Sequence, residues 1–536
     1  MFAEPVTGAE HVGGGQDIPS QHMTLLNFQS QTGGHLMGNV PENKPLQRFV
    51  GDLSPEARLL DGNPSTGWTD GILISEEGVW GPRSDQTYAP ASDLIETEDV
   101  LALTDLYFTN IHPVIPLLNE QETRKSISEN TAPTALVNAI CLIAAKDKAA
   151  GTHLKLSGPG ERPVPVRKFC SRLYESVTRA VCIGTSLKKI TLIRILGLLS
   201  LHHEGCDGAE QASWHIAPAM LHAQTLALHL NRPNDNDSEM KTVFWWCLWT
   251  LDRLNAAINS RPCVMNDMDM TIEPLNPSQS KSVAFDIWFR IASMLNSVIA
   301  LYRPTNPESV TGMDMDYPGF EQIVEEMQGW HLPLPTLATL RIFYLATAML
   351  SCRPKTTKSL PTSSPAGMRQ ELSAIQVIRY MQDNERLQAL HPIPVIVYAA
   401  SLALSVSYQQ LRYSRLASHQ EEAYSDFNTA CDILQVLQRK WTSADGMLDK
   451  IPNLPFLRVN IICSETKDQS REASQPCAEG SNVYGLYPAS PQACLQQNAM
   501  WNPGVLDSDH FEGAETPANL ENYPFIDTGI FEEALL

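Results

Sequence analysis

The sequence predicts an all-α protein. From residue 98 to about residue 458, apolar residues recur three and four positions apart, which is the spacing of one helix face. The β-branched alternation that marks strands is scarce, and the breaks between apolar segments carry Pro, Gly or Asn. Because βαβ units are missing as well, the doubly wound nucleotide-binding folds are excluded, and we expect about a dozen helices.

Composition divides the chain into three zones. Residues 1–96 are rich in Gly, Pro, Ser, Thr, Gln and Asn and sustain no helical or strand period, so we predict a largely disordered region. Residues 97–460 form the predicted helical domain. Residues 461–536 are loop-like, contain no Lys or Arg beyond Arg471, and are predicted to form a disordered acidic–aromatic tail.

The predicted helices of the first half follow one another from residue 99. DVLALTDLYFTNI starts as a helix and stops at His112 and Pro113, because the residue before a proline disfavours the helical region. Further helical periods cover residues 136–148, 168–184, 190–205 and 212–230.

The second half continues the same texture. Helical periods cover residues 285–302, 320–330, 336–350, 370–382 and 427–441. The longest apolar stretch, residues 393–408, is interrupted by Pro394 and three serines. It falls short of the roughly 20 apolar residues that a membrane span needs, so we predict a buried helix and no membrane segment.

One segment between these halves holds three of the chain's 10 tryptophans. Residues 243–262 read VFWWCLWTLDRLNAAINSRP, and Asn236 with Glu239 three residues later indicates a capped helix start near Asp237. Apolar residues cover nearly the whole circumference of the predicted helix. Such a helix is typically central and surrounded by its neighbours.

Asp252 and Arg253 lie inside this apolar segment, where an unpaired charge would be unfavourable. Adjacent helical residues point about 100° apart, so we expect the two not to pair with each other. We expect Arg261, just after the helix end, to reach Asp252, and Arg253 to anchor another helix end or carboxylate. This interpretation makes both charges architectural rather than catalytic.

Charge and cysteine usage exclude several classes of protein. The net charge of −21 argues against a chain that grips phosphate backbones along its length, because Lys and Arg supply that affinity. The 11 cysteines include no CxxC pair, and residues 1–140 contain none, so no zinc site is predicted. Reduced cysteines in apolar runs and the lack of a signal-peptide pattern indicate an intracellular protein.

Motifs of catalysis are also missing. No GxSxG, GxxxxGK[ST] or strand-linked GxGxxG occurs, and His203 with Glu204 does not complete an HExxH pattern. His215, His222 and His229 recur every seven residues along one expected helix face, too far apart to share a metal, and we interpret them as core, interface or capping residues. We therefore predict no enzyme, no metal and no cofactor; a helical small-molecule-binding protein or enzyme remains an alternative.

The central segment resembles the middle homology region of fungal-specific transcription factors, a large helical domain. The family pattern runs roughly FW-x-L-x-x-x-DR, then GRP and D-x-D, after an upstream tryptophan. In this chain the matching residues are Trp214, Phe244, Trp245, Asp252, Arg253, Arg261, Pro262, Asp267 and Asp269. LYFTNIHPVIPLL at residues 106–118 and GWHLPLP with SCRP at residues 329–354 resemble the opening and closing motifs of the domain, so the resemblance covers about residues 100–460.

The chain departs from the family pattern at two places. The family's glycines are replaced by Ala217, Ala227 and Ser260. The binuclear zinc cluster that usually accompanies the domain needs six cysteines, and residues 1–140 provide none. Either a first exon is missing from the sequence or the protein acts without contacting DNA directly.

The resemblance implies a nuclear regulator of transcription by RNA polymerase II. The family's domain is thought to respond to metabolites and to promote dimerisation, so a buried effector pocket and a homodimer, or a zinc-cluster partner, are expected. In the acidic tail, exposed aromatic residues can fold into a coactivator groove. The aromatic residues of this predicted activation region are Phe511, Tyr523, Phe525 and Phe531. We further expect the target genes to lie in a specialised-metabolite cluster. As an alternative, the protein is a co-regulator that acts only through a DNA-binding partner.

Overall fold

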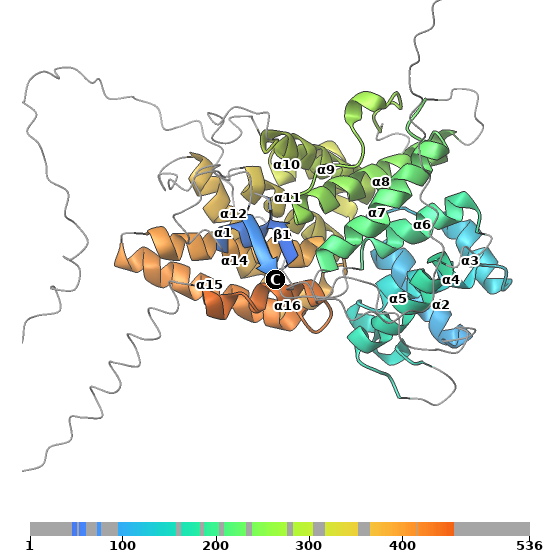
Figure 1. Cartoon of the computed structure of the whole chain (residues 1–536), viewed down its shortest axis with the longest axis horizontal. Helices are drawn as coiled ribbons and strands as arrows, with labels where there is room; N and C mark the ends of the chain where they lie inside the picture. Colours follow the sequence, from blue (N-terminus) through green and yellow to red (C-terminus); the bar gives the residue numbers. More distant parts are fainter. Residues whose placement is uncertain are drawn as a thin grey trace, which may run out of the picture. The chain divides into compact units, whose positions relative to one another are not determined.

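The computed structural model describes twelve stretches of the chain (Figure 1). They are residues 46–50, 53–59, 72–76, 95–156, 162–182, 187–202, 208–231, 238–275, 282–303, 317–351, 365–414 and 416–454.

Helices dominate the described residues, as predicted. The first half contains α2 (Thr97–Asn110), α3 (Glu120–Ser128), α4 (Thr134–Ala144), α5 (Val166–Cys182), α6 (Lys189–Leu199) and α7 (Gly208–Thr225). The centre contains α8 (Ser238–Asn259), α9 (Val283–Leu301), α10 (Phe320–Glu326) and α11 (Leu334–Ser351). The second half contains α12 (Pro365–Met381), α13 (Asn384–Ala389), α14 (Val395–Tyr413), α15 (Ala417–Leu437) and α16 (Thr442–Leu448). Four 3-10 turns, η1 (Lys148–His153), η2 (Asp267–Asp269), η3 (Gly329–His331) and η4 (Ile451–Asn453), lie between or after these helices.

The N-terminal region contains three short elements that the sequence did not predict. β1 (Leu46–Val50) pairs antiparallel with β2 (Ile72–Glu76), with Leu46 opposite Glu76, and α1 (Pro55–Leu59) lies between them. The prediction of a largely disordered region in residues 1–96 did not single out these elements. Each is five residues long, too short to show a period among the surrounding Gly and Pro residues.

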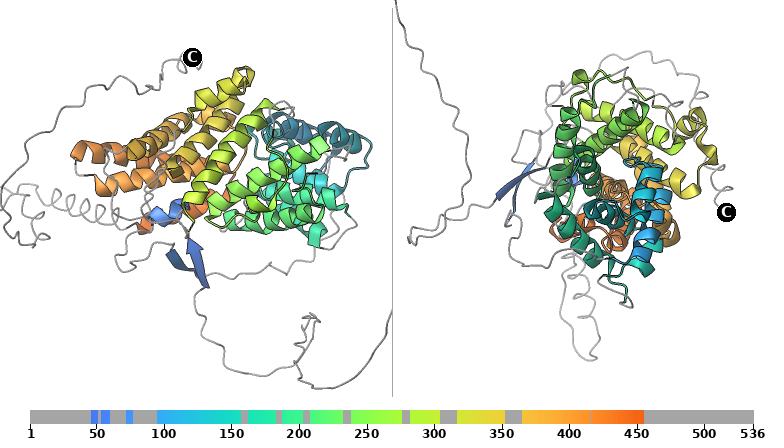
Figure 2. Two further views of the ribbon diagram at one scale, coloured as in Figure 1. Left: turned by 90° about the horizontal axis from the view of Figure 1, so that it is seen from above. Right: turned by 90° about the vertical axis from the view of Figure 1, so that its right-hand side faces the viewer.

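The helices form a continuous succession of contacts within residues 46–454. α2 packs on α4, α4 on α5 and α6, α6 on α7, and α7 on α8. α8 then packs on α9, α9 on α11, and α11 on both α12 and α14, while α14 packs on α15. Figure 2 shows α14 and α15 in orange at one end of this arrangement and α2 to α5 in blue and teal at the other. One hydrophobic cluster runs through all of it, from Leu53 to Leu454.

α8 is the central helix that the sequence predicted. It begins at Ser238, next to the expected start at Asp237. Trp245, Cys247 and Leu248 are fully buried, and Leu251 and Leu254 are nearly so. Thr250 is also fully buried, and its hydroxyl accepts a hydrogen bond from Trp288 Nε1 of α9 at 3.1 Å. The all-round apolar pattern therefore correctly identified a helix with neighbours on every side.

The apolar stretch at residues 393–408 is likewise a buried helix. Every residue of α14 from Val395 to Tyr408 is buried in the fold. Within the described residues, α9 and α11 are long and apolar enough to cross a membrane by length and composition. Both are largely buried among other helices, which is equally typical of core helices.

Candidate functional site

The residues that follow α8 form a loop, residues 263–275, that two tryptophans of α8 hold in place. Trp246 Nε1 donates to the carbonyl of Glu273 at 2.9 Å, and Trp249 Nε1 donates to Asp267 Oδ1 at 2.9 Å. The two indole rings also meet edge to face, with centroids 5.4 Å apart. Tryptophan combines a large apolar body with one donor, so each side chain both fills the core and fixes a loop.

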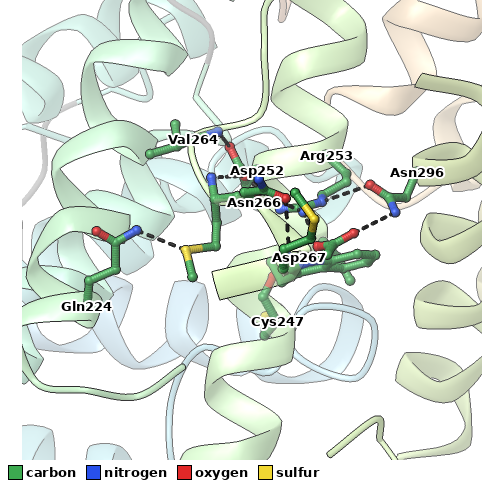
Figure 3. A network of polar contacts seen from close by, with 12 residues as sticks. Gln224, Cys247, Asp252, Arg253, Val264, Asn266, Asp267 and Asn296 are labelled. Carbon is green, nitrogen blue, oxygen red and sulfur yellow. Dashed lines mark hydrogen bonds and ion pairs between the residues drawn. The ribbon is translucent and has the colours of Figure 1, made fainter. Parts of the chain in front are cut away.

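Asp252 binds the start of the same loop (Figure 3). Its Oδ1 accepts from the backbone N–H of Val264 at 3.0 Å, and its Oδ2 accepts from the N–H of Met265 at 3.3 Å. Arg253 Nη1 donates to Oδ2 at 2.8 Å. A carboxylate buried in α8 thus gathers two amides and one guanidinium.

Arg253 distributes its donors over three further groups. Nη2 donates to the carbonyl of Met265 at 2.9 Å and to Asp267 Oδ1, and Nε donates to Asn296 Oδ1 of α9 at 3.2 Å. The guanidinium also lies over the ring of Trp249, 4.3 Å from its centroid. The planar fork of arginine suits such a junction, because its donors point in fixed and different directions.

Asp267 closes the network from the loop side. Besides Arg253 and Trp249, it accepts a hydrogen bond from Asn296 Nδ2 at 2.9 Å on Oδ2. Asp252 and Arg253 are almost completely buried, whereas the side chain of Asp267 is 40% exposed. Burial raises the pKa of Asp252, and the Arg253 guanidinium and the two amides oppose that rise. The network therefore joins α8, α9 and the loop. Because Asp252 and Arg253 are buried, each of these charges would be costly without its partner.

Two expectations about these charges need correction. Asp252 and Arg253 do pair, because the long arginine side chain bends back over the distance that separates adjacent helical positions. The carboxylate of Asp252 takes Arg253 and the loop amides as its partners instead of Arg261. The further expectation, that Arg253 anchors another carboxylate, is met by Asp267.

The segment that ends α7 meets the loop that follows α8. The carbonyl of His229 accepts hydrogen bonds from the N–H groups of Thr271 and Ile272, at 3.1 and 3.2 Å. The His229 ring lies 5.8 Å from the ring of Trp245. Gln224 Nε2 of α7 donates to Met265 Sδ at 3.0 Å. The two family-like segments are therefore adjacent in space as well as in sequence order.

Two of the three replaced glycines occupy left-handed backbone. Ala227 has φ 53° and Ser260 has φ 51°. Both close a helix in the same way: Leu228 N–H donates to Ala223 O at 3.1 Å after α7, and Arg261 N–H donates to Ala256 O at 2.9 Å after α8. Glycine is favoured in this helix-ending motif because a Cβ is strained there. Ala217, in contrast, lies inside α7.

The other predicted signature residues do not join the network. Phe244 is buried and faces the guanidinium of Arg194 on α6 at 6.0 Å. Trp214 of α7 is 71% exposed, so it contributes nothing to the core at this point. Arg261 and Pro262 lie in the turn after α8, and Asp269 is exposed at the end of η2. Sequence reasoning named neither Asn296 nor the Trp246 and Trp249 donors as site residues, because their partners become adjacent only in the folded chain.

The histidines give no metal site among the described residues. No group of three or more His, Cys, Asp or Glu side chains there could hold a metal ion. His215 Nε2 lies 2.8 Å from the hydroxyl of Tyr174 on α5. α7 ends at Thr225, so the expectation that His229 shares a helix face with His215 and His222 is wrong. His203 and Glu204 lie outside the described residues.

The expected effector pocket stays a prediction. One open groove is lined by Cys431, Gln435, Gln438, Leu448, Ile451 and Pro452, between α15 and the α16–η4 segment. Elsewhere, several buried polar atoms lack a hydrogen-bond partner in the described part of the chain. Tyr107 Oη and Thr104 Oγ1 of α2 are among them. The predicted activation residues Phe511, Tyr523, Phe525 and Phe531 lie outside the described residues.

Comparison with protein families gives a match to this part of the chain. Residues 104–307 match the model of the fungal specific transcription factor domain. The matched range begins inside α2 and extends beyond α9, so it contains α8, the loop and Asn296. Residues 329–354, which resemble the closing motif, lie beyond the matched range.

Three curated relatives are similar over larger ranges. The Zn(2)-C6 fungal-type transcription factor FTF1c of Fusarium oxysporum f. sp. lycopersici is 24% identical over 276 residues, 47% of this chain and 28% of the relative. The Zn(2)-C6 fungal-type transcription factor FTF2 of the same organism is 25% identical over 264 residues, 43% of this chain and 22% of the relative. Cutinase transcription factor 1 alpha of Fusarium vanettenii is 21% identical over 379 residues, 63% of this chain and 41% of the relative.

The aligned part thus spans between about a fifth and two fifths of these relatives' lengths. No solved structure matches the chain significantly. The relatives are named as transcription factors, a class of proteins that are not enzymes, in agreement with the prediction from the sequence.

Proposed function

We propose that this protein regulates transcription by RNA polymerase II in the nucleus of a fungal cell, because residues 104–307 match the model of the fungal specific transcription factor domain. The observation that carries the proposal is that the matched range contains α8, the central helix, together with its contacts. The charged network, the two helix-ending turns and the tryptophan-held loop all lie inside it. A fluorescent fusion of the full chain that stayed exclusively cytosolic would contradict the nuclear role.

The acidic tail supplies activation in this proposal. Residues 507–536 hold eight carboxylates and three phenylalanines, a composition that suits binding to a coactivator groove. The full chain, tethered to a promoter through a heterologous DNA-binding domain, should activate a reporter. Replacing Phe525 and Phe531 by Ala should reduce the output severalfold. Tyr484→Ala, upstream of the acidic run, is the matched control, and equal output from both variants would remove the activation role.

A co-regulator that reaches DNA through a partner is the second candidate. Residues 1–140 contain none of the six cysteines that a binuclear zinc cluster needs, and a partner that carries such a cluster would supply them. Purification of the full chain from its native cells should then recover a zinc-cluster protein, and the purified chain alone should not retard promoter DNA. Retardation by the chain alone would instead support direct binding. A homodimer and a small-molecule effector belong to the same proposal.

The target genes are proposed to lie in a specialised-metabolite gene cluster. Transcript profiling of a deletion strain tests this point. A change confined to one group of neighbouring biosynthetic genes is the expected result, and a change spread over unrelated genes would contradict it.

A further inference from the structure

The short N-terminal segment 53–59 is packed against the far end of the chain. Leu53 and Leu59 belong to the hydrophobic cluster of the helical domain, with 5% and 1% of their surface exposed, and Ser54 and Pro55 are buried too. α1, which ends this segment, packs on α14 (Figure 1). More than three hundred residues separate the two partners in sequence.

Two polar contacts hold the segment at either side. Tyr398 Oη of α14 donates to the carbonyl of Leu53 at 3.0 Å. Lys450 Nζ, directly before η4, pairs with Glu56 Oε2 at 2.6 Å, and their side chains are only 22% and 16% exposed. The segment therefore presents two apolar residues with one carboxylate between them, and its site offers an apolar floor, a hydroxyl donor and an ammonium group.

The Tyr398 hydroxyl also contacts the end of α8. It lies 3.2 Å from the carbonyl of Ala257 in the last turn of α8. A tyrosine hydroxyl has one hydrogen, so the carbonyls of Leu53 and Ala257 share or exchange that donor. When the segment leaves, the hydrogen remains bonded to Ala257, and no buried donor is left without a partner. The segment can therefore leave without breaking the hydrogen bond at the end of α8.

From this arrangement we infer that the face made by α14 and Lys450 is a peptide-docking site, which residues 53–59 occupy and can leave while the helical domain stays folded. The site fits a short helical peptide with apolar ends and a central carboxylate. Through Tyr398 its occupant is linked to the end of α8, and so to the turn that leads into the network loop. This inference is independent of the proposed function.

Hydrogen exchange on the full chain, followed by mass spectrometry of peptides covering residues 53–59 and 254–261, tests the inference. Leu59→Asp should expel the segment and raise its exchange rate at least tenfold. The reason is that burial of a leucine side chain stabilises the docked segment more than one net hydrogen bond does. Residues 254–261 should keep their protection in this variant. Tyr398→Phe should raise exchange in both peptides, by about fivefold divided between them, since the two carbonyls lose the one hydrogen that they share. Tyr413→Phe, at an exposed position of the same helix, should change neither peptide.

Charge-reversal variants provide a second test, which does not require the Leu59→Asp variant to fold. Lys450→Glu and Glu56→Lys should each accelerate exchange in residues 53–59 severalfold, and the double variant should return it toward the wild-type rate. Two outcomes would overturn the inference. In one, residues 53–59 exchange as fast in the wild type as in Leu59→Asp. In the other, Leu59→Asp exposes residues 254–261 as much as Tyr398→Phe does, which would make the segment an integral part of the core.

Discussion

At the scale of single residues, the paired charges of α8 show how a buried ion pair can serve geometry. Asp252 and Arg253 satisfy each other and still have bonds left for two loop amides, one loop carboxylate and Asn296. Pairs of this kind contribute little net stability compared with apolar residues of equal volume, but the loss of one partner is costly. The network therefore fixes where the loop lies, at the risk of a large penalty when it is broken.

Replacing Asp252 by Asn tests that risk. The variant preserves volume but removes the negative charge, so Arg253 stays buried with one carboxylate instead of two. We expect the free energy of unfolding to fall by about 3 kcal/mol, measured by urea denaturation. Asp269→Asn, exposed in the same loop, should change it by less than about 0.5 kcal/mol. Equal losses in the two variants would refute the role of the buried pair.

Three substitutions by glycine should separate backbone strain from helix propensity. Ser260→Gly and Ala227→Gly relieve a Cβ in left-handed backbone, so each should raise the free energy of unfolding by about 0.5–1 kcal/mol, after allowing for the freedom of glycine in the unfolded chain. Ala217→Gly lies inside α7 and should lower it by about the same amount. A common sign for all three, in thermal or urea unfolding, would contradict this explanation.

At the scale of the elements, buried histidines join helices and make their packing dependent on pH. His215 links α7 to Tyr174 of α5, and His391 Nε2 lies 2.8 Å from Thr336 Oγ1 of α11. Burial lowers the pKa of both, and that of His112 after α2, to about 4. In all three, the folded chain favours the neutral ring.

Acidification should therefore destabilise the protein between about pH 6.5 and pH 4. The unfolded chain takes up a proton on each histidine near pH 6.5, whereas the folded chain does so only near pH 4, so stability is intact above this window and falls within it. We expect a loss of about 1 kcal/mol per histidine at pH 5.5. Urea denaturation of His215→Gln across this range should show a shallower pH dependence.

The elements also show what a single sequence can and cannot predict. α8 and α14 were predictable because burial on all sides leaves an apolar pattern that needs no partner to be recognised. α3, α13 and α16 were missed because they are short and polar, so their helices depend on capping and contacts. Asn119 caps α3 and Asp383 caps α13, each through backbone N–H groups of the next turn. In the site, Asp252, Arg253 and Asp267 were identified, but their pairing was not, because Val264 and Met265 reach Asp252 only through the path of the loop.

At the scale of the whole molecule, the hydrophobic cluster extends beyond the range that matches the family. α9 packs on α11, and α11 on α12 and α14, so the matched residues 104–307 end in the middle of a continuous core. We expect a fragment of residues 95–307 to lack a cooperative thermal transition, because it would expose the face of α9 that α11 covers.

The fragment of residues 46–460 provides the comparison. It retains the whole cluster from Leu53 to Leu454, and its thermal midpoint by circular dichroism should lie within a few degrees of that of the full chain. Cooperative unfolding of the shorter fragment would show that the matched range is a domain by itself, and would contradict the predicted boundaries at residues 97 and 460.

The tryptophan-held loop also gives the protein an intrinsic optical probe. The indoles of Trp246 and Trp249 touch each other, donate to the loop and, for Trp249, lie beneath a guanidinium, while Trp245 faces an imidazole. Emission from these rings depends on their quenchers and on the polarity around them. Any ligand or binding partner that shifts residues 263–275 will therefore change the native fluorescence, and titrations can follow that change without attaching a dye.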